Sequence, residues 1–183
     1  IAAQAGSQVH LFDVNAAAVQ QAHATVLAQW DKLLEKGRID AAQHQAYKAS
    51  LQPAATLADL APCDLVIEAA IEHLDIKRKL FADLEDIVRP DAVLATNTSS
   101  LSVTAIGAGL QRPQRLAGYH FFNPVPLMKV VEVIAGLKTD PAVCAGLSAY
   151  AHQMGHTPVQ AQDTPGFIVN HAGRAYGTEA LRI

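Results

Sequence analysis

The chain has 183 residues, of which half are hydrophobic and 17% are charged. This length and balance are typical of a globular protein with a buried core, and they exclude a disordered chain. The formal net charge is −3 and the pI is near 6.2. Because the chain has no excess of basic residues, we do not expect a nucleic-acid partner.

The cysteines and the lengths of the apolar runs set further limits. Cys63 and Cys144 lie far apart and in no metal-ligand spacing, so we expect two reduced thiols and no metal site. No apolar run approaches the roughly 20 residues that span a bilayer, so we expect no membrane partner. No signal peptide is visible, although Ile1 is not a natural start, and we take a cytoplasmic location as the default.

The chain opens on IAAQAG, which we interpret as the tail of a helix, and 8–14 (QVHLFDV) is predicted to be a strand. A helix follows, with Asn15 placed to cap it and apolar residues at near-helical spacing. Gly37 ends that helix. Asp40 begins a second helix, which we expect to run through about Leu51.

The rest of the chain alternates strands and helices. Strands are predicted at 64–69, 92–96, 115–120, 129–134 and 157–161, and helices at 74–88, 103–108, 140–154 and from Gly166 onward. This alternation predicts an α/β fold, a Rossmann-like doubly wound sheet that is mainly parallel. Such a sheet normally opens with a strand, a glycine-rich turn and a helix. No G-x-G-x-x-G occurs in the chain, so we expect the first strand and its glycine loop to precede Ile1.

Asp13 ends the first predicted strand. In a dinucleotide fold, a carboxylate at the end of the second strand accepts hydrogen bonds from the adenosine ribose. It also opposes a 2′-phosphate, which favours NAD over NADP. An ordinary turn aspartate is the alternative.

The segment ATNTSSLS (95–102) follows a buried strand and precedes a helix, so we expect it at the carboxyl edge of the sheet, where such folds bind ligands. Its polar side chains have no role in a core. Asn97 and Ser99 are therefore candidates for meeting a cofactor. The alternative is that Ser102 and its neighbours only cap the next helix.

The densest group of candidate residues lies in YHFFNPVPLMKVVEV (119–133). Glu132 sits inside an apolar strand, where an unpaired carboxylate is very costly, so it needs a partner. His120, at a strand end, is one candidate: a His–Glu pair fixes the imidazole tautomer and gives a general base for removing a hydroxyl proton. Lys129 competes as a partner, in which case the pair is a structural salt bridge.

The segment DTPGFIVNHAGRAY (163–176) begins a helix after a Pro-Gly pair. The helix carries Asn170 and Arg174 on adjacent turns of one face. The Asn170 amide is suited to a hydrogen bond with a substrate carbonyl, and an interhelical contact is the alternative.

Together, TNTSSLS, HFFNPVPLMKVVEVI and DTPGFIVN resemble the 3-hydroxyacyl-CoA dehydrogenases, and the similarity runs over essentially the whole chain. The resemblance implies that His120 is the catalytic base or acid and that Glu132 orients it. It implies that Ser99 and Asn170 hold the substrate's 3-oxygen. It also places Asn123 near the nicotinamide and the thioester.

The same resemblance implies cofactor and CoA contacts. Asp13 matches the ribose-binding acid, and Glu72 and Lys77 match positions that contact the nicotinamide ribose and phosphates of NAD. Lys36 matches a position that meets the CoA moiety. The implied substrate is an acyl-CoA, and the implied full-length protein is a homodimer.

The tail from 170 to 183 resembles the branch that acts on 3-hydroxyadipyl-CoA in phenylacetate breakdown. Arg174 is suited to pairing with a distal carboxylate, although His171 stands where most members have arginine. The alternative is a 3-hydroxybutyryl-CoA dehydrogenase.

The resemblance divides the chain into an NAD-binding domain at 1–162 and the start of an all-α C-terminal domain at 163–183. Without the glycine loop and the rest of the helical domain, we expect the 183-residue chain to be inactive by itself. Three other hypotheses remain: a non-catalytic crystallin-like member, a dehydrogenase acting on β-hydroxy acids without CoA, and a protein with a hydratase fused upstream.

Overall fold

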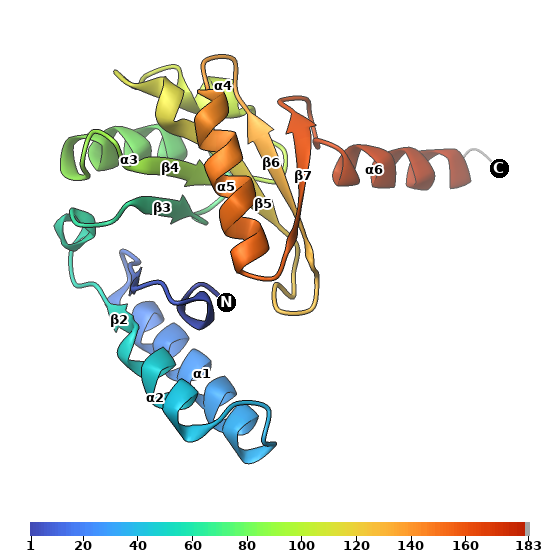
Figure 1. The fold of residues 1–183 in the computed structure, drawn as a ribbon. Helices are drawn as coiled ribbons and strands as arrows, with labels where there is room; N and C mark the ends of the chain where they lie inside the picture. Colours follow the sequence, from blue (N-terminus) through green and yellow to red (C-terminus); the bar gives the residue numbers. More distant parts are fainter. Residues whose placement is uncertain (182–183) are drawn as a thin grey trace. The chain divides into compact units, whose positions relative to one another are not determined.

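The computed structural model describes residues 1–181. These residues form two compact units, one from Ile1 to Ala61 and one from Pro62 onward. Figure 1 labels most of the helices and strands of both.

The first unit combines a helical hairpin with two short parallel strands (Figure 1). Its elements are η1 (Ala3–Ala5), β1 (Val9–Leu11), α1 (Ala16–Glu35), α2 (Ala41–Ala49), β2 (Leu51–Pro53) and η2 (Leu57–Leu60). Residues of both helices and both strands share one small core, whose buried members are Ala3, Trp30 and Leu51. The Trp30 and Tyr47 rings lie 5.7 Å apart and join the helices.

Side-chain caps explain where the two helices begin. The Asn15 side chain accepts hydrogen bonds from two backbone N–H groups at the start of α1. Asp40 and Gln43 form a reciprocal capping box at the start of α2. Both caps satisfy N–H groups that a helix cannot pair internally.

The expected end of the second helix is wrong. Helix α2 ends at Ala49 with Ser50 as its C-cap, and Leu51 is the first residue of strand β2. Leu51 pairs in parallel register with Val9 of β1, so this short strand exists because of a partner far away in the sequence.

The second unit is built on a five-stranded sheet in the order β3-β4-β5-β6-β7. Its strands are β3 (Leu65–Glu68), β4 (Val93–Thr96), β5 (Leu116–Phe121), β6 (Val130–Ala135) and β7 (Thr157–Gln162). Its helices are α3 (Leu74–Ile87), α4 (Val103–Gly107), η3 (Pro113–Arg115), α5 (Pro141–Gln153) and α6 (Val169–Ala180). Three neighbouring pairs of strands are parallel and only β5 and β6 are antiparallel, which confirms the predicted α/β fold with a mainly parallel sheet.

Alternate residues of β5 show that helices cover both faces of this sheet. Gly118 faces α4, since a Cβ built on it would lie 3.0 Å from the Val103 side chain. Tyr119 faces the other way and donates its hydroxyl to the Leu147 carbonyl of α5, at 3.0 Å. His120 follows on the face that Gly118 occupies, because side chains alternate along a strand.

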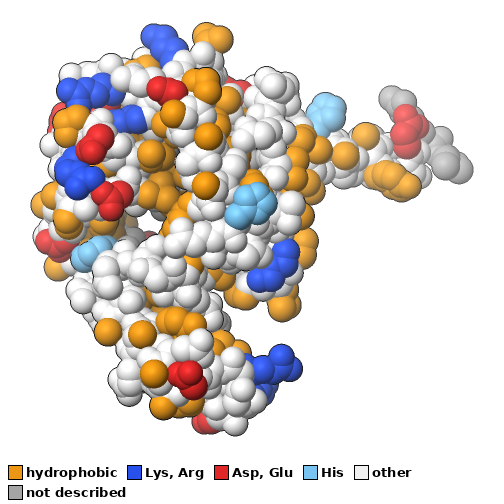
Figure 2. Space-filling model, in the orientation of Figure 1, with side chains coloured by type: hydrophobic (Ala, Val, Ile, Leu, Met, Phe, Trp, Pro, Cys, Tyr) orange, Lys and Arg blue, Asp and Glu red, His pale blue; other side chains and the backbone are white. Residues whose placement is uncertain are grey.

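Helix α6 starts at Val169, three residues later than expected. Gly166 (φ 79°) and Phe167 (φ 50°) adopt left-handed conformations, which make a turn before the helix. None of the residues from Val169 to Ala180 is buried, and Figure 2 shows hydrophobic side chains along this segment. Tyr176 and Leu181 are 87% and 88% exposed.

We expect Gly118→Ala to lower the free energy of unfolding by about 1–3 kcal/mol through overpacking. The added Cβ would lie 2.9 Å from two carbons of Ile134, a residue with no solvent exposure. Urea denaturation measures the change. Gly146→Ala is the matched control: it lies in α5 with nothing within 4 Å of the added carbon, and there we expect a gain of roughly 0.5–1 kcal/mol. Equal effects at the two positions would contradict the packing described.

Candidate active site

The carboxyl ends of β3, β4 and β5 lie along one edge of the sheet, because the three strands are parallel. Asn97 joins them. Its backbone N–H donates to the Glu68 carbonyl at 2.8 Å, and its side-chain Oδ1 accepts from the Phe121 N–H at 2.8 Å. Asn97 therefore links β3 and β5 at the edge of the sheet where we predict that ligands bind.

His120 and Glu132 face each other across the antiparallel strands β5 and β6. His120 Nδ1 lies 2.7 Å from Glu132 Oε2. Glu132 is 0% exposed and His120 is 5% exposed, whereas Lys129, the rival partner, is exposed. A carboxylate only accepts hydrogen bonds, so the histidine proton lies on Nδ1 in this contact.

The second oxygen of Glu132 holds the beginning of α6. Oε1 accepts from the N–H groups of Ile168 and Val169, at 2.9 Å each. These are amides at a helix start, which a helix leaves unpaired. Both oxygens of this buried carboxylate are therefore hydrogen-bonded to donors within the protein.

Two aromatic rings lie beside the imidazole. The His120 ring lies 4.5 Å from Phe122 and 5.8 Å from Phe167. Phe167 is 3% exposed and holds a left-handed backbone conformation, which costs a non-glycine residue about 1–3 kcal/mol. Within residues 1–181, His120 Nε2 makes no hydrogen bond, so its lone pair is available to a ligand.

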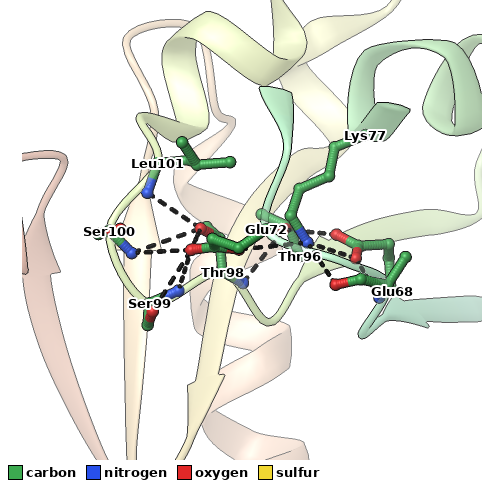
Figure 3. A network of polar contacts seen from close by, with 9 residues as sticks. Glu68, Glu72, Lys77, Thr96, Thr98, Ser99, Ser100 and Leu101 are labelled. Atoms are coloured by element: carbon green, nitrogen blue, oxygen red, sulfur yellow. Dashed lines mark hydrogen bonds and ion pairs between the residues drawn. The ribbon is translucent and has the colours of Figure 1, made fainter. Parts of the chain in front are cut away.

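The turn after β4 is organised by one carboxylate, Glu72 (Figure 3). Glu72 Oε1 accepts from the Thr98 hydroxyl at 2.5 Å, and from the N–H groups of Ser99 and Ser100 at 2.9 and 3.2 Å. The Ser99 hydroxyl lies 3.3 Å from the same oxygen. Partial burial alone would raise the pKa of Glu72, but hydrogen bonds from this turn and the charge of Lys77 outweigh it and hold the pKa below its usual value.

The structure brings Ser99 and Asn170 together. Asn170 Nδ2 donates to the Ser99 backbone carbonyl at 3.2 Å. Asn170 follows directly after Val169, whose N–H contacts Glu132. Four of the predicted site residues (His120, Glu132, Ser99 and Asn170) are thus connected by hydrogen bonds through the first turn of α6.

Lys77, for which the resemblance implies a cofactor contact, lies in a buried ion pair with Glu68. Its Nζ is 2.5 Å from Glu68 Oε1 and 3.2 Å from the Ala70 carbonyl, and both charged side chains are 1% exposed. Sequence reasoning missed Glu68. The signal was present, since Glu68 is a carboxylate in an apolar strand, as Glu132 is.

A second missed residue is Asp163, which anchors the segment before α6. Its carboxylate accepts from the Ser102 hydroxyl and from the N–H groups of Val103 and Thr104, each at 2.8 Å. Burial alone would raise the pKa of Asp163, but these hydrogen bonds outweigh it and lower the pKa. Ser102 does cap α4, through its contact with the Ala105 N–H.

The remaining predicted residues are exposed. Asp13 and Lys36 belong to the first unit, where Asp13 Oδ1 accepts from the Asn15 N–H at 2.8 Å. Asn123 follows β5, and Arg174 lies on α6. Among residues 1–181, no group of three or more His, Cys, Asp or Glu side chains is arranged to hold a metal ion, and none of their helices is long and apolar enough to cross a membrane.

Comparison with known proteins identifies the family. The family model described as 3-hydroxyacyl-CoA dehydrogenase, NAD binding domain, matches residues 1–164. The chain belongs to this family. NAD is accordingly the cofactor of the domain.

Individual relatives carry two different substrate names. The chain is 43% identical over 182 residues to a 3-hydroxyadipyl-CoA dehydrogenase of Escherichia coli, covering 100% of this chain and 38% of that protein. It is 38% identical over 170 residues to a 3-hydroxybutyryl-CoA dehydrogenase of Bradyrhizobium diazoefficiens, covering 93% of this chain and 58% of that protein. The chain therefore spans well under two thirds of these relatives.

Solved structures agree with the fold. A crystal structure of 3-hydroxybutyryl-CoA dehydrogenase from Escherichia coli superposes with a TM-score of 0.96 at 43% identity, over 99% of this chain and 38% of that one. The FadB2 protein of M. tuberculosis superposes with a TM-score of 0.91 at 34% identity, over 99% of this chain and 64% of that one.

We expect Asp163→Asn to lower the free energy of unfolding by about 1–2 kcal/mol at pH 7, as loss of a helix cap does. The folded pKa of Asp163 lies below the unfolded value near 3.9. Its contribution is therefore present above about pH 4 and is lost as the pH falls through the folded pKa. Denaturation of both proteins between pH 7 and pH 3 measures this, and a difference that does not shrink in acid would count against the assignment.

Proposed function

We propose that the complete protein containing this chain oxidises (S)-3-hydroxyacyl-CoA to 3-oxoacyl-CoA, with His120 as the acid/base group. One observation carries the proposal. The His120 ring is fixed by Glu132 through Nδ1, and its Nε2 has no hydrogen-bond partner in the described part of the chain. A histidine held in this way is suited to exchanging a proton with a ligand.

In the oxidation direction, His120 Nε2 takes the proton of the 3-hydroxyl, and the Glu132 carboxylate stabilises the imidazolium that results. In the reverse direction, protonated His120 returns that proton to the 3-oxo group. Such positioned proton transfer typically contributes about 10²–10⁴-fold to the rate.

Ser99 and Asn170 hold the substrate's 3-oxygen in this proposal. Asn170 Nδ2 donates to the Ser99 backbone carbonyl at 3.2 Å, so the two residues lie side by side. This supports a shared role, because Asn170 directly follows Val169, whose N–H donates to Glu132. Holding the reacting carbon in a fixed orientation lowers the entropic part of the barrier.

The residues present fit NAD. Asp13 is exposed after β1, and only its Oδ1 has a hydrogen bond within residues 1–181, so Oδ2 is available to a ribose diol. Asn97 Nδ2 likewise has no protein acceptor among those residues, and Asn123 is exposed. When bound, NAD supplies the chemistry of accepting the hydride from the substrate carbon.

For the acyl group we propose a dicarboxylic substrate of the 3-hydroxyadipyl-CoA type, used in phenylacetate catabolism. Arg174 supports this, because its guanidinium is exposed and makes no ion pair with any described residue. A 3-hydroxybutyryl-CoA substrate is the second candidate, since relatives with that name are also similar.

The exposed apolar side chains of α6 and of Leu181 support a proposal about what covers this helix in the complete protein. Tyr176 and Leu181 are almost fully exposed, and a helix with such a surface is typically covered by another element. We propose that an all-helical domain and a homodimer contact supply this cover in the complete protein. Lys36 is proposed to meet the CoA moiety, and the location is proposed to be cytoplasmic.

We expect the complete protein to oxidise NADH with 3-oxoadipyl-CoA and, more slowly, with acetoacetyl-CoA. His120→Gln keeps a polar side chain of similar size but removes the proton-exchanging ring. We expect it to lower kcat by about 10²–10⁴-fold, measured by the loss of NADH absorbance. No turnover by folded protein that binds NADH would refute the dehydrogenase proposal and favour a non-catalytic or CoA-independent member.

Arg174→Met tests the substrate class with the same assay. Loss of a charge-assisted contact should reduce kcat/KM for 3-oxoadipyl-CoA about tenfold or more and leave acetoacetyl-CoA nearly unchanged. An equal loss for both substrates would contradict the role of Arg174 and leave the enzyme class intact.

A further inference from the structure

His156 is a buried histidine that the proposed chemistry does not use. It is 2% exposed and lies between α5 and β7. Gly155 adopts a left-handed conformation (φ 75°), and the N–H groups of Gly155 and His156 donate to carbonyls in the last turn of α5, at 3.0 and 2.9 Å. This is the glycine-terminated turn that commonly ends a helix. The backbone of His156 is therefore fixed by the end of α5.

Both nitrogens of the His156 ring face backbone carbonyls. Nδ1 lies 3.2 Å from the carbonyl oxygen of Met154, and Nε2 lies 3.1 Å from that of Val125. A carbonyl oxygen only accepts, so each hydrogen bond requires a proton on the ring nitrogen, and a neutral imidazole carries one proton. Met154 is the C-cap of α5, whereas Val125 lies 31 residues earlier, in the loop between β5 and β6. Only the contact through Nε2 joins distant parts of the unit.

The loop between β5 and β6 (122–129) is mostly exposed. Two of its hydrogen bonds are local, since the N–H groups of Leu127 and Met128 donate to the Pro124 carbonyl at 2.9 and 3.0 Å. Within residues 1–181, no donor other than His156 meets the Val125 carbonyl. His156 therefore supplies the hydrogen bond that ties the middle of this loop to the folded unit.

The His156 ring also contacts the chain just before this loop. It lies edge-on to Phe121, the last residue of β5, with the ring centroids 5.6 Å apart. Phe122 and Asn123 lie between this contact and the loop carbonyl that faces Nε2. The Phe122 ring in turn lies 4.5 Å from the ring of His120. Holding a segment at both ends reduces the number of conformations open to the residues between them.

We propose that His156 is a positioning residue for Phe122 and Asn123, acting through an Nε2–H that donates to the Val125 carbonyl. Phe122 packs against the proposed acid/base histidine, and the proposed function assigns Asn123 to the NAD site. A loop without this hydrogen bond samples more conformations, so both side chains spend less time in the arrangement that the reaction needs. The inference rests on the proposed function for what these two residues do, and not for how the loop is held.

Two matched variants of the complete protein separate the two contacts of the ring. His156→Gln places an amide nitrogen about where Nε2 lies, so it can still donate to Val125. His156→Asn has a shorter side chain, whose amide nitrogen lies about where Nδ1 does and can donate only to Met154. Both variants are neutral amides without the aromatic ring, so we expect similar losses of folding stability, measured by urea denaturation. Only His156→Asn releases the loop.

Amide hydrogen exchange, measured by NMR, reports on the loop without turnover. Exchange at Leu127 and Met128 should be about tenfold faster in His156→Asn and within about threefold of the parent in His156→Gln, because an untied loop opens more often. The Thr139 amide, which donates to a carbonyl in the turn after β6, is the internal control and should not change. In the parent, ¹⁵N NMR of the His156 ring should show a proton on Nε2.

With acetoacetyl-CoA, kcat should fall about tenfold in His156→Asn and less than threefold in His156→Gln. Equal effects of the two variants on exchange would overturn the inference, because the loss would then come from the ring. Unchanged exchange in His156→Asn, faster exchange with parental kcat, or an Nε2 without a proton would also overturn it. Faster exchange in His156→Asn alone, when the parent has no turnover, would support the anchoring of the loop and refute the dehydrogenase proposal, so the two failures are distinguishable.

Discussion

Glu132 is a carboxylate with no exposed surface, and every hydrogen bond it needs must come from the protein. One oxygen takes the imidazole of His120, and the other takes two backbone amides at the start of α6. Removing one partner of such a buried group leaves the other uncompensated, at a cost of about 3–5 kcal/mol. The position of the histidine and the entry into α6 are therefore set by the same residue.

This arrangement makes the segment between β7 and α6 an organised part of the site. Asp163 ties its beginning to the start of α4, and Asn170 ties its end to Ser99. Between them, the left-handed turn at Phe167 directs two N–H groups at Glu132. The strain of that turn persists because the contacts on either side over-determine it.

The apolar pattern was sufficient to predict most of the strands and helices. It failed at β2, which has three residues and ends in Pro53. No periodicity can identify so short a strand, whose existence depends on pairing with β1 some 42 residues earlier. The beginning of α6 was also misplaced, because the backbone is left-handed at Phe167 and the amides that follow it bond to Glu132 on a distant strand.

The site was partly predictable for a specific physical reason. A carboxylate inside VVEVI must have a partner, which singled out Glu132 and made His120 a candidate. The same rule applied to Glu68 would have found the pair with Lys77, but its partner lies across a loop whose path the sequence does not show. The contact between Ser99 and Asn170 joins residues 71 positions apart, so no local pattern predicts it, although the resemblance implies that both residues meet the same substrate oxygen.

The central claim is that Glu132 holds His120 with its proton on Nδ1 and leaves Nε2 as the base. ¹⁵N NMR of the histidine rings, with the His120 signals assigned by comparison with His120→Gln, tests this most directly. The account predicts a protonated Nδ1 and an unprotonated Nε2 in the neutral ring, and loss of this single tautomer in Glu132→Ala. A neutral His120 ring protonated on Nε2, or one whose tautomer is unaffected by Glu132→Ala, would contradict it.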